Sequence, residues 1–173
     1  NKLKSSFQRL AKHKQSKGLK TAIVTTEQIY KEYSGRDNAE KVRNFIKEAY
    51  KKNRVKYILL GGDGDGDADN PKAVVPTRIL YCPPVSDGVT TQIASDMYYA
   101  CLGGNYDSNR NGIYGEPGDG TGGKEVDLGY DVFVGRAPVD SKKEANNFVS
   151  KTINYEKRTK QKKALMVGEQ LTG

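Results

Sequence analysis

Apolar residues recur at helical spacing in three stretches of the chain, and turn and capping residues bound each stretch. Gly18 ends the first stretch. Asp37 with Glu40, and Ser141 with Glu144, have the spacing of a capping box and start the second and third. The apolar positions are Leu3, Phe7, Leu10 and Ala11 in the first helix, Ala39, Val42, Phe45, Ile46, Ala49 and Tyr50 in the second, and Ala145, Phe148, Val149, Thr152 and Ile153 in the third.

Short continuous apolar runs, rich in β-branched residues, predict strands between these helices. Strands with continuous apolar runs that alternate with amphipathic helices are typical of parallel sheets covered on both faces. We therefore predict an α/β fold with a mostly parallel sheet of about four to five strands and helices on both faces. The predicted strands are TAIVTT (21–26), KYILLGG (56–62), VPTRILY (75–81), DVFVGR (131–136) and KALMVGE (163–169).

Two long polar, Gly-rich stretches interrupt this pattern, at Gly61–Pro76 and Leu102–Tyr130. Loops of this length in a compact domain are usually functional or disordered. Both follow a strand or an apolar segment, and ligands of such folds bind beyond the carboxyl ends of the strands. The two loops are therefore the first places to look for a site.

Length and charge limit the classes of protein to which the chain can belong. The 173 residues suffice for one domain with a sizeable core, and no apolar run is long enough to span a membrane. The net charge of +8 is compatible with nucleic-acid binding, but the basic residues occupy the polar positions of the predicted helices. Since no aromatic–basic stacking motif accompanies them, we expect solvated helix faces and no nucleic-acid partner. The chain starts without Met and ends just after an apolar run, which favours a piece of a longer protein.

The stretch LLGGDGDGDADNP gathers four carboxylates directly after a predicted strand. A phosphate-binding loop is excluded, because the loop is anionic and leads into Asn70-Pro71 rather than a helix. A hard cation such as Ca²⁺ suits these oxygen ligands better, and a solvated acidic turn explains the later aspartates equally well. Asp63 differs from them, because its position directly after the strand is set by the sheet.

A second acidic stretch, NYDSNRNGIYGEPGDG, contains the pattern D-x-N-x-N-G that begins an EF-hand loop. The twelfth position of such a loop is Gly118 here rather than Glu, and flanking helices are missing, so this is no EF-hand. An independent calcium turn and a plain Asn/Gly turn both remain open. The ligands of a calcium turn would be Asp107, Asn109, Asn111, the carbonyl of Ile113, and Glu116.

The sequence offers few candidates for a nucleophile and a general base. His13 is the only histidine and lies among lysines on the first predicted helix, where we expect it to be exposed. Cys82 and Cys101 are too few for a disulfide framework, and we expect free, partly buried thiols. No loop motif places either thiol beside His13 as a Cys–His dyad requires. The sequence therefore shows no complete hydrolytic site and predicts no catalytic residue.

Several segments resemble, in order, the gingipain-type cysteine peptidases, which are secreted bacterial enzymes with a caspase-like α/β fold. The resemblance covers nearly the whole chain and is most specific at LLGGD, SDMYYACL and DVFVGR. The matching segments are FQRLAKHKQSKGLKTAIVTTEQI, AEKVRNFIKEAY, KYILLGGD, SDMYYACLGG and DVFVGRAPVDSKKEANNFVSKTINYEK.

The resemblance implies two α/β subdomains in tandem. Residues 1–160 are similar to the first subdomain, and residues 161–173 to the first strand of the second, catalytic one. The family's catalytic His and Cys lie downstream of the matched region, so the chain is expected to be a non-catalytic N-terminal part of a secreted or cell-surface cysteine endopeptidase. Its expected partners are the catalytic subdomain of the same polypeptide and, for the intact enzyme, protein or peptide substrates.

The resemblance also implies a calcium site that ties the LLGGD strand end to the segment before the VGR strand. Its ligands correspond to the carboxylates of Asp63, Asp127 and Asp131 and to the carbonyls of Gly103 and Gly129. The alternative interpretation is a calcium-dependent extracellular binding module without enzymatic activity, since a fold does not determine its function. That alternative predicts ligand binding by this chain alone.

Overall fold

A computed structural model describes residues 2–64, 73–83 and 91–158 of the chain. None of the helices in these ranges is long and apolar enough to cross a bilayer. In chain order the elements are α1 (Lys4–Ser16), α2 (Thr26–Glu32), α3 (Asn38–Asn53), β1 (Tyr57–Gly61), β2 (Arg78–Cys82), β3 (Thr91–Ser95), α4 (Met97–Ala100), the 3₁₀ turn η1 (Thr121–Gly123), β4 (Phe133–Ala137) and α5 (Lys142–Lys157).

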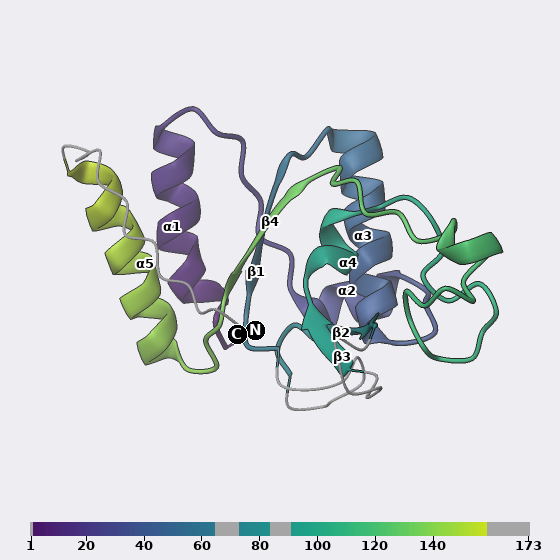
Figure 1. The fold of residues 1–173 in the computed structure, drawn as a ribbon. Coiled ribbons are helices and arrows are strands. Elements are labelled where there is room, and N and C mark those ends of the chain that lie inside the picture. The colour runs from purple at the N-terminus through teal and green to yellow at the C-terminus, as the bar shows by residue number, and fades with distance from the viewer. Residues whose placement is uncertain (1, 65–72, 84–90, 159–173) are drawn as a thin grey trace, which may run out of the picture.

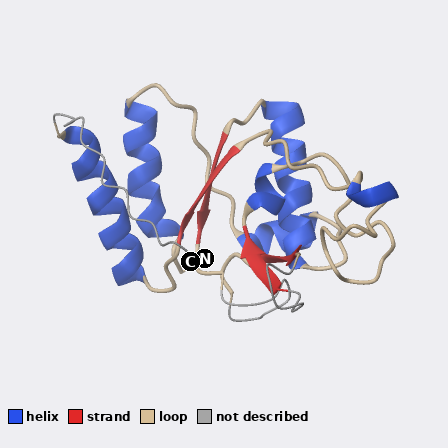
Figure 2. Cartoon of the chain, viewed as in Figure 1, coloured by secondary structure: helices blue, strands red, loops and turns tan. Residues whose placement is uncertain are grey.

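The strands form two small sheets rather than one (Figure 2). β1 and β4 pair in parallel from Tyr57↔Phe133 to Gly61↔Ala137, whereas β2 and β3 form an antiparallel pair. The predicted single sheet of four to five strands is therefore not found in the described residues, and the predicted strand 163–169 lies outside them. The predictions at 56–62, 75–81 and 131–136 each coincide with an observed strand to within a few residues.

The prediction of a strand at 21–26 is wrong. These residues belong to no strand, and Thr25 instead caps α2 by accepting a hydrogen bond from the Gln28 N–H. Ile23 and Val24 are nonetheless half-buried, and they pack on the two different cores. The β-branched residues of this segment thus reflect burial rather than sheet pairing.

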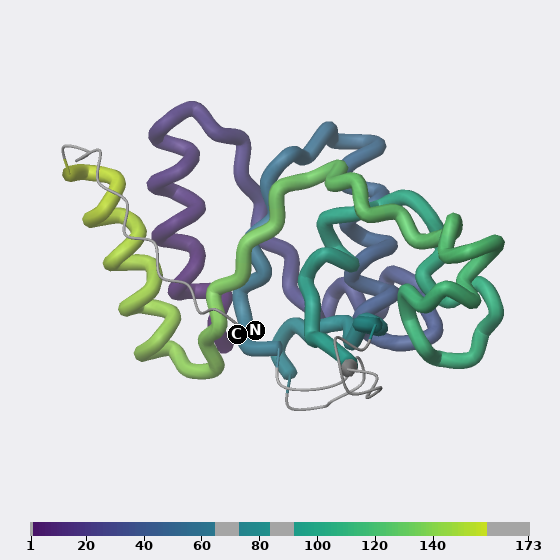
Figure 3. Tube along the Cα trace, in the orientation of Figure 1, coloured from purple at the N-terminus to yellow at the C-terminus, as the bar shows by residue number. Residues whose placement is uncertain are grey.

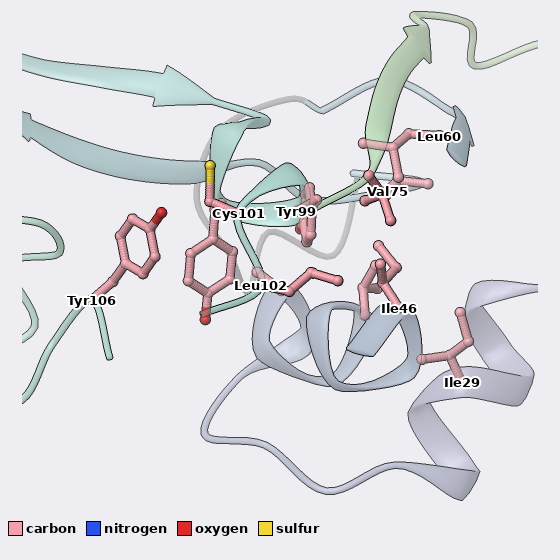
Figure 4. Close-up of a cluster of buried hydrophobic side chains, with 12 residues drawn as sticks. Ile29, Ile46, Leu60, Val75, Tyr99, Cys101, Leu102 and Tyr106 are labelled. Carbon is pink, nitrogen blue, oxygen red and sulfur yellow. The ribbon is translucent and has the colours of Figure 1, made fainter. Parts of the chain in front are cut away.

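Helices cover both faces of the parallel pair, as predicted. Figure 1 shows α1 and α5 on one side of β1 and β4, and α2, α3 and α4 on the other. Leu60 of β1 is buried with α2, α3 and α4, whereas Ala137 of β4 is buried with α1 and α5. The larger core, shown in Figure 4, also includes Ile46, Tyr99 and Leu102.

The caps predicted for the second and third helices are both present. Ser141 and Glu144 form a full capping box at the start of α5. At the start of α3, the Asp37 carboxylate accepts a hydrogen bond from the Glu40 N–H at 2.8 Å. The Glu40 carboxylate reaches one residue further back, to the N–H of Arg36 at 2.5 Å.

His13 is more enclosed than predicted. Its side chain is only 13% exposed, and its Nε2 lies 3.1 Å from Oε2 of Glu156 on α5. Lys14 and Lys17 bind the same carboxylate and, led by Lys14, lower the pKa of Glu156 to about 2. This group of ions joins the carboxyl-terminal ends of α1 and α5, whose traces run side by side in Figure 3.

Candidate functional site

Asp63 lies where the sequence places it, directly beyond the carboxyl end of β1. Its N–H donates to the carbonyl of Val139 at 3.1 Å, and its carbonyl accepts from Val74 and Val75. One carboxylate oxygen accepts a hydrogen bond from the N–H of Gly64 at 2.7 Å. Asp63 therefore organises the loop after β1, while the aspartates 65, 67 and 69 lie outside the described residues.

The other four residues of the predicted calcium site gather before the amino end of β4. The Asp131 carboxylate accepts from the Leu102 N–H at 2.8 Å, and that of Asp127 accepts from the Gly129 N–H at 2.9 Å. Asp127 also packs against Gly103 so closely that a Cβ at that glycine would lie 2.2 Å from its Oδ2. Any larger residue at position 103 would require the Asp127 carboxylate to move.

The structure does not bring Asp63 to these four residues. Asp131 precedes the first pair of the parallel strands by two residues, and Asp63 follows the last pair by two residues. The two side chains are thus eight residues apart along the strand direction, which is roughly 26 Å at a rise of about 3.3 Å per residue. One ion cannot contact both.

A guanidinium group already occupies the corner formed by the residues around Gly103. Arg43 of α3 is 5% exposed and donates to the carbonyls of Tyr98 at 2.8 Å, Cys101 at 2.7 Å and Gly103 at 2.6 Å. Among residues 2–64, 73–83 and 91–158, no group of three or more His, Cys, Asp or Glu side chains is arranged to hold a metal ion. Arg43 therefore joins α3 to the segment from Tyr98 to Gly103 through three carbonyl groups.

The Asp107–Glu116 turn is compact and built from side-chain oxygens. The Asp107 carboxylate is 2% exposed and accepts from the Gly112 N–H at 3.3 Å and from Arg36 at 2.6 Å. The amides of Asn109 and Asn111 both lie against one carboxylate oxygen of Glu116, at 2.9 and 2.5 Å. Asn109, Asn111 and Glu116 therefore contact one another, and Asp107 joins the same turn through the Gly112 N–H. Ile113 contributes its N–H to Asn111.

Asp119, which the sequence analysis did not single out, anchors the same turn from beneath. It is fully buried and accepts hydrogen bonds from three backbone N–H groups, those of Ser108, Gly115 and Glu116. Three such donors satisfy a carboxylate without a counter-ion. The repeated acid–glycine spacing of this stretch indicates a turn. Which of its acidic side chains is buried cannot be predicted from that spacing.

The described residues also contain a cluster of arginine and tyrosine side chains that sequence reasoning missed. Arg78 lies 3.7 Å from the ring centre of Tyr114 and 4.6 Å from that of Tyr98, and Arg43 lies 4.7 Å from that of Tyr98. We call this the Arg–Tyr cluster; its members are Arg36, Arg43, Arg78, Tyr98, Tyr106 and Tyr114. Cation–π contacts of this kind strengthen when the cation is removed from water.

Arg78 links the cluster to the start of α3. It is 3% exposed and binds Asp37 Oδ1 at 2.7 Å. Burial opposes the ionisation of Asp37, but the hydrogen bonds from Arg78 and from the Glu40 N–H outweigh it and lower the pKa of Asp37. The Nε of Arg78 is the one buried side-chain polar atom without a hydrogen-bond partner in the described residues.

Arg136 performs a similar structural task at the other end of the parallel pair. Its guanidinium binds both carboxylate oxygens of Asp96, at 2.8 and 2.6 Å. It also donates to the carbonyls of Gly62 at 2.9 Å and Val75 at 2.6 Å. One side chain of β4 thereby holds the loop after β1, the segment before β2 and the start of α4.

The histidine and the buried thiol lie on opposite sides of the parallel pair. His13 lies on α1, on one side of β1 and β4, whereas Cys101 is buried in the core on the other side, near Tyr106 (Figure 4). Burial, and secondarily the nearby charges of Asp127 and Asp131, raise the pKa of the Cys101 thiol. Cys82 is half-buried on β2, and both cysteines are free, as predicted. Catalytic thiols require a lowered pKa and an adjacent base.

A comparison with models of protein families places the chain in a known family. The family model described as peptidase family C25 matches residues 1–173. Searches of curated proteins and of solved structures find no match for the chain.

Proposed function

Because the chain belongs to peptidase family C25, we propose that it is a non-catalytic, calcium-stabilised part of a gingipain-type cysteine endopeptidase. In this proposal the chain supports a catalytic subdomain of the same polypeptide, which supplies the nucleophile and the base. The intact enzyme would act on peptide bonds of proteins or peptides at the cell surface or outside the cell.

The arrangement of histidine and cysteine carries this proposal. The only histidine of the sequence is held by Glu156 between α1 and α5. Of the two thiols, the buried one lies across β1 and β4 from that histidine, and its pKa is raised rather than lowered. Cysteine-type hydrolysis needs both groups within hydrogen-bond reach.

An uncovered apolar surface supports the idea of a partner subdomain. Tyr57, Phe133 and Tyr130 are 69%, 53% and 70% exposed, and their rings contact one another with centres 5.3 and 5.4 Å apart. They surround the amino ends of β1 and β4, beyond the part of the sheet that α1 and α5 cover. Exposed apolar surface of this kind is typical of interaction sites.

We expect the isolated chain to hydrolyse no peptide substrate, and the Cys101→Ser and His13→Ala variants to behave identically. The measurement is cleavage of a denatured protein and of mixed fluorogenic peptides under reducing conditions. Addition of a catalytic part from the same family, expressed separately, is expected to give cleavage that depends on the added part's own thiol. Hydrolysis by the isolated chain that Cys101→Ser abolishes would contradict the proposal.

The calcium part of the proposal rests on the Asp107–Glu116 turn. Its oxygens are the hard ligands that Ca²⁺ prefers, and an ion bound there would compete with Arg36 for the buried Asp107 carboxylate. The expected ligands are Asp107, Asn109, Asn111, the Ile113 carbonyl and Glu116. Asp63 is not part of this set, and its hydrogen bonds go instead to Gly64, Val74, Val75 and Val139.

We expect calcium to raise the melting temperature of the chain by about 5 °C or more over excess EGTA, since an ion bound only to the folded state stabilises it. Asp107→Asn should remove this increase, while the matched variant Asp63→Asn should retain it. If Asp63→Asn removed the increase and Asp107→Asn retained it, the calcium site would lie at the strand end and not in the turn. No increase in any variant would overturn calcium binding without affecting the peptidase assignment.

A further inference from the structure

The positive charge of the chain is concentrated on one layer of the fold. Residues 2–20 and 141–158 contain twelve Lys and Arg against two Asp and Glu, whereas residues 21–140 contain fourteen against eighteen. The first two ranges form α1 and α5 with their flanks, and they lie side by side at one end of the molecule in Figure 1. We call them the α1–α5 layer. The layer is strongly basic, while residues 21–140 carry a small net negative charge.

Ion pairs within the layer leave most of this positive charge without a counter-charge. The carboxylate of Glu156 is bound by His13, Lys14 and Lys17, and that of Glu144 accepts backbone N–H groups at the start of α5. Both acids of the layer are therefore already neutralised or capped. The side chains that remain exposed include those of Lys4, Lys12, Lys20, Lys143 and Lys151.

The excess of lysine over arginine in this layer indicates a partner whose negative charge is spread over a wide surface. Ten of the twelve are lysines, which act as point charges, whereas arginine is the residue that recognises single phosphates in a fixed geometry. One of the two arginines, Arg9, is used inside the layer, where it donates to the carbonyl of Asn146 at 3.1 Å and to the side chain of Ser150.

Two exposed apolar side chains lie among the lysines at the same end of the layer. Leu19 and Tyr155 are 48% and 70% exposed. Leu19 donates its N–H to the carbonyl of Lys14, and Lys14 binds Glu156, the neighbour of Tyr155. A lysine-rich surface with an exposed Tyr and Leu has the composition of proteins that rest at the headgroup level of a membrane.

We propose that the α1–α5 layer is a docking surface for an anionic lipid bilayer. Lysines on both helices meet the negative headgroups, and Leu19 and Tyr155 contact the interface at one end. The bilayer is favoured over a folded protein partner by the breadth of the charge, which extends over two adjacent helices. This inference does not depend on the peptidase assignment.

The experiment is co-sedimentation of the 173-residue chain with vesicles in about 0.1 M salt. One vesicle type contains phosphatidylcholine with phosphatidylglycerol, and the other contains phosphatidylcholine alone. The layer variant reverses Lys4, Lys12, Lys143 and Lys151 to Glu. The control variant reverses Lys31, Lys51, Lys56 and Lys124, which are exposed on the rest of the fold, so that both variants have the same net charge.

We expect binding to the anionic vesicles alone, a loss of about a hundredfold or more in the layer variant, and a change of at most a few-fold in the control variant. Circular dichroism and a thermal melt confirm that each variant is folded, and Lys→Gln versions replace any variant that is not. Equal losses in the two variants would overturn the proposal, because net charge alone would then explain the binding. No binding to anionic vesicles, or tighter binding to a short DNA duplex than to the vesicles, would also overturn it.

Discussion

Replacing Tyr99 with alanine is expected to destabilise the fold by about 3–5 kcal/mol, the usual cost of removing a fully buried large aromatic side chain. Tyr99 is 0% exposed and packs edge-on against Tyr98, with ring centres 5.7 Å apart. The cavity would open in the larger core, where Figure 4 shows Tyr99 among Leu60, Val75 and Leu102. The measurement is urea unfolding followed by far-ultraviolet circular dichroism.

Tyr99→Phe is the matched control for this change. It keeps the ring and removes only the hydroxyl, which donates to the carbonyl of Pro76. That carbonyl also lies 3.5 Å from Nη2 of Arg136, so the expected loss is about 1 kcal/mol. A loss in Tyr99→Ala no larger than that in Tyr99→Phe would show that this core is not packed as the structure describes it.

Replacing Arg78 with methionine is expected to cost about 3–5 kcal/mol, because the change leaves the carboxylate of Asp37 buried without its counter-charge. The side chains of Arg78 and Asp37 are 4% and 9% exposed, respectively. The change also removes the guanidinium from its position between the rings of Tyr98 and Tyr114. Chemical denaturation again measures the loss.

The double variant Arg78→Met with Asp37→Ser tests the reason for that cost. Serine retains the ability to cap α3 and carries no charge, so most of the lost stability should return. If the double variant were as unstable as Arg78→Met alone, the contacts with the tyrosine rings, and not the unpaired carboxylate, would account for the effect. The two outcomes separate the ion pair from the cation–π contacts.

The helices were predictable because their signals are local. The positions of α3 and α5 follow from capping residues and from apolar side chains three and four residues apart, and both helices begin where those residues place them. α2 was missed because the β-branched residues before it resemble a strand. The side chain of Thr25 caps that helix, and this local hydrogen bond takes the place of sheet pairing. Whether a strand partner is available for residues 21–26 is known only from the tertiary structure.

One part of the candidate site could be predicted from the sequence and another part could not, for geometric reasons. Asp107, Asn109, Asn111 and Glu116 lie within ten residues, and their place in one hydrogen-bonded turn follows from that short separation. Asp63 and Asp131 were joined by resemblance across nearly seventy residues of chain. Whether such residues meet depends on strand direction and register, and the parallel register of β1 and β4 places them at opposite ends.

The buried arginines show what no local pattern could reveal. Arg43 and Arg78 occupy polar positions of an amphipathic helix and a short strand, where arginine is normally exposed. They are buried because carbonyl groups, a carboxylate and tyrosine rings from distant segments together replace water around each guanidinium. That replacement requires the segments to be assembled first.

The amino-acid sequence by itself determined the α/β class, the family, the extents of α3 and α5, and the places of the acidic turns, since each depends on residues close together in the chain. The tertiary structure alone decided that the strands form two sheets, that Asp63 stands apart from Asp127 and Asp131, and that arginines hold the core loops together. Pairing register and the desolvation of charged groups depend on contacts between distant segments, and those contacts exist only in the folded chain.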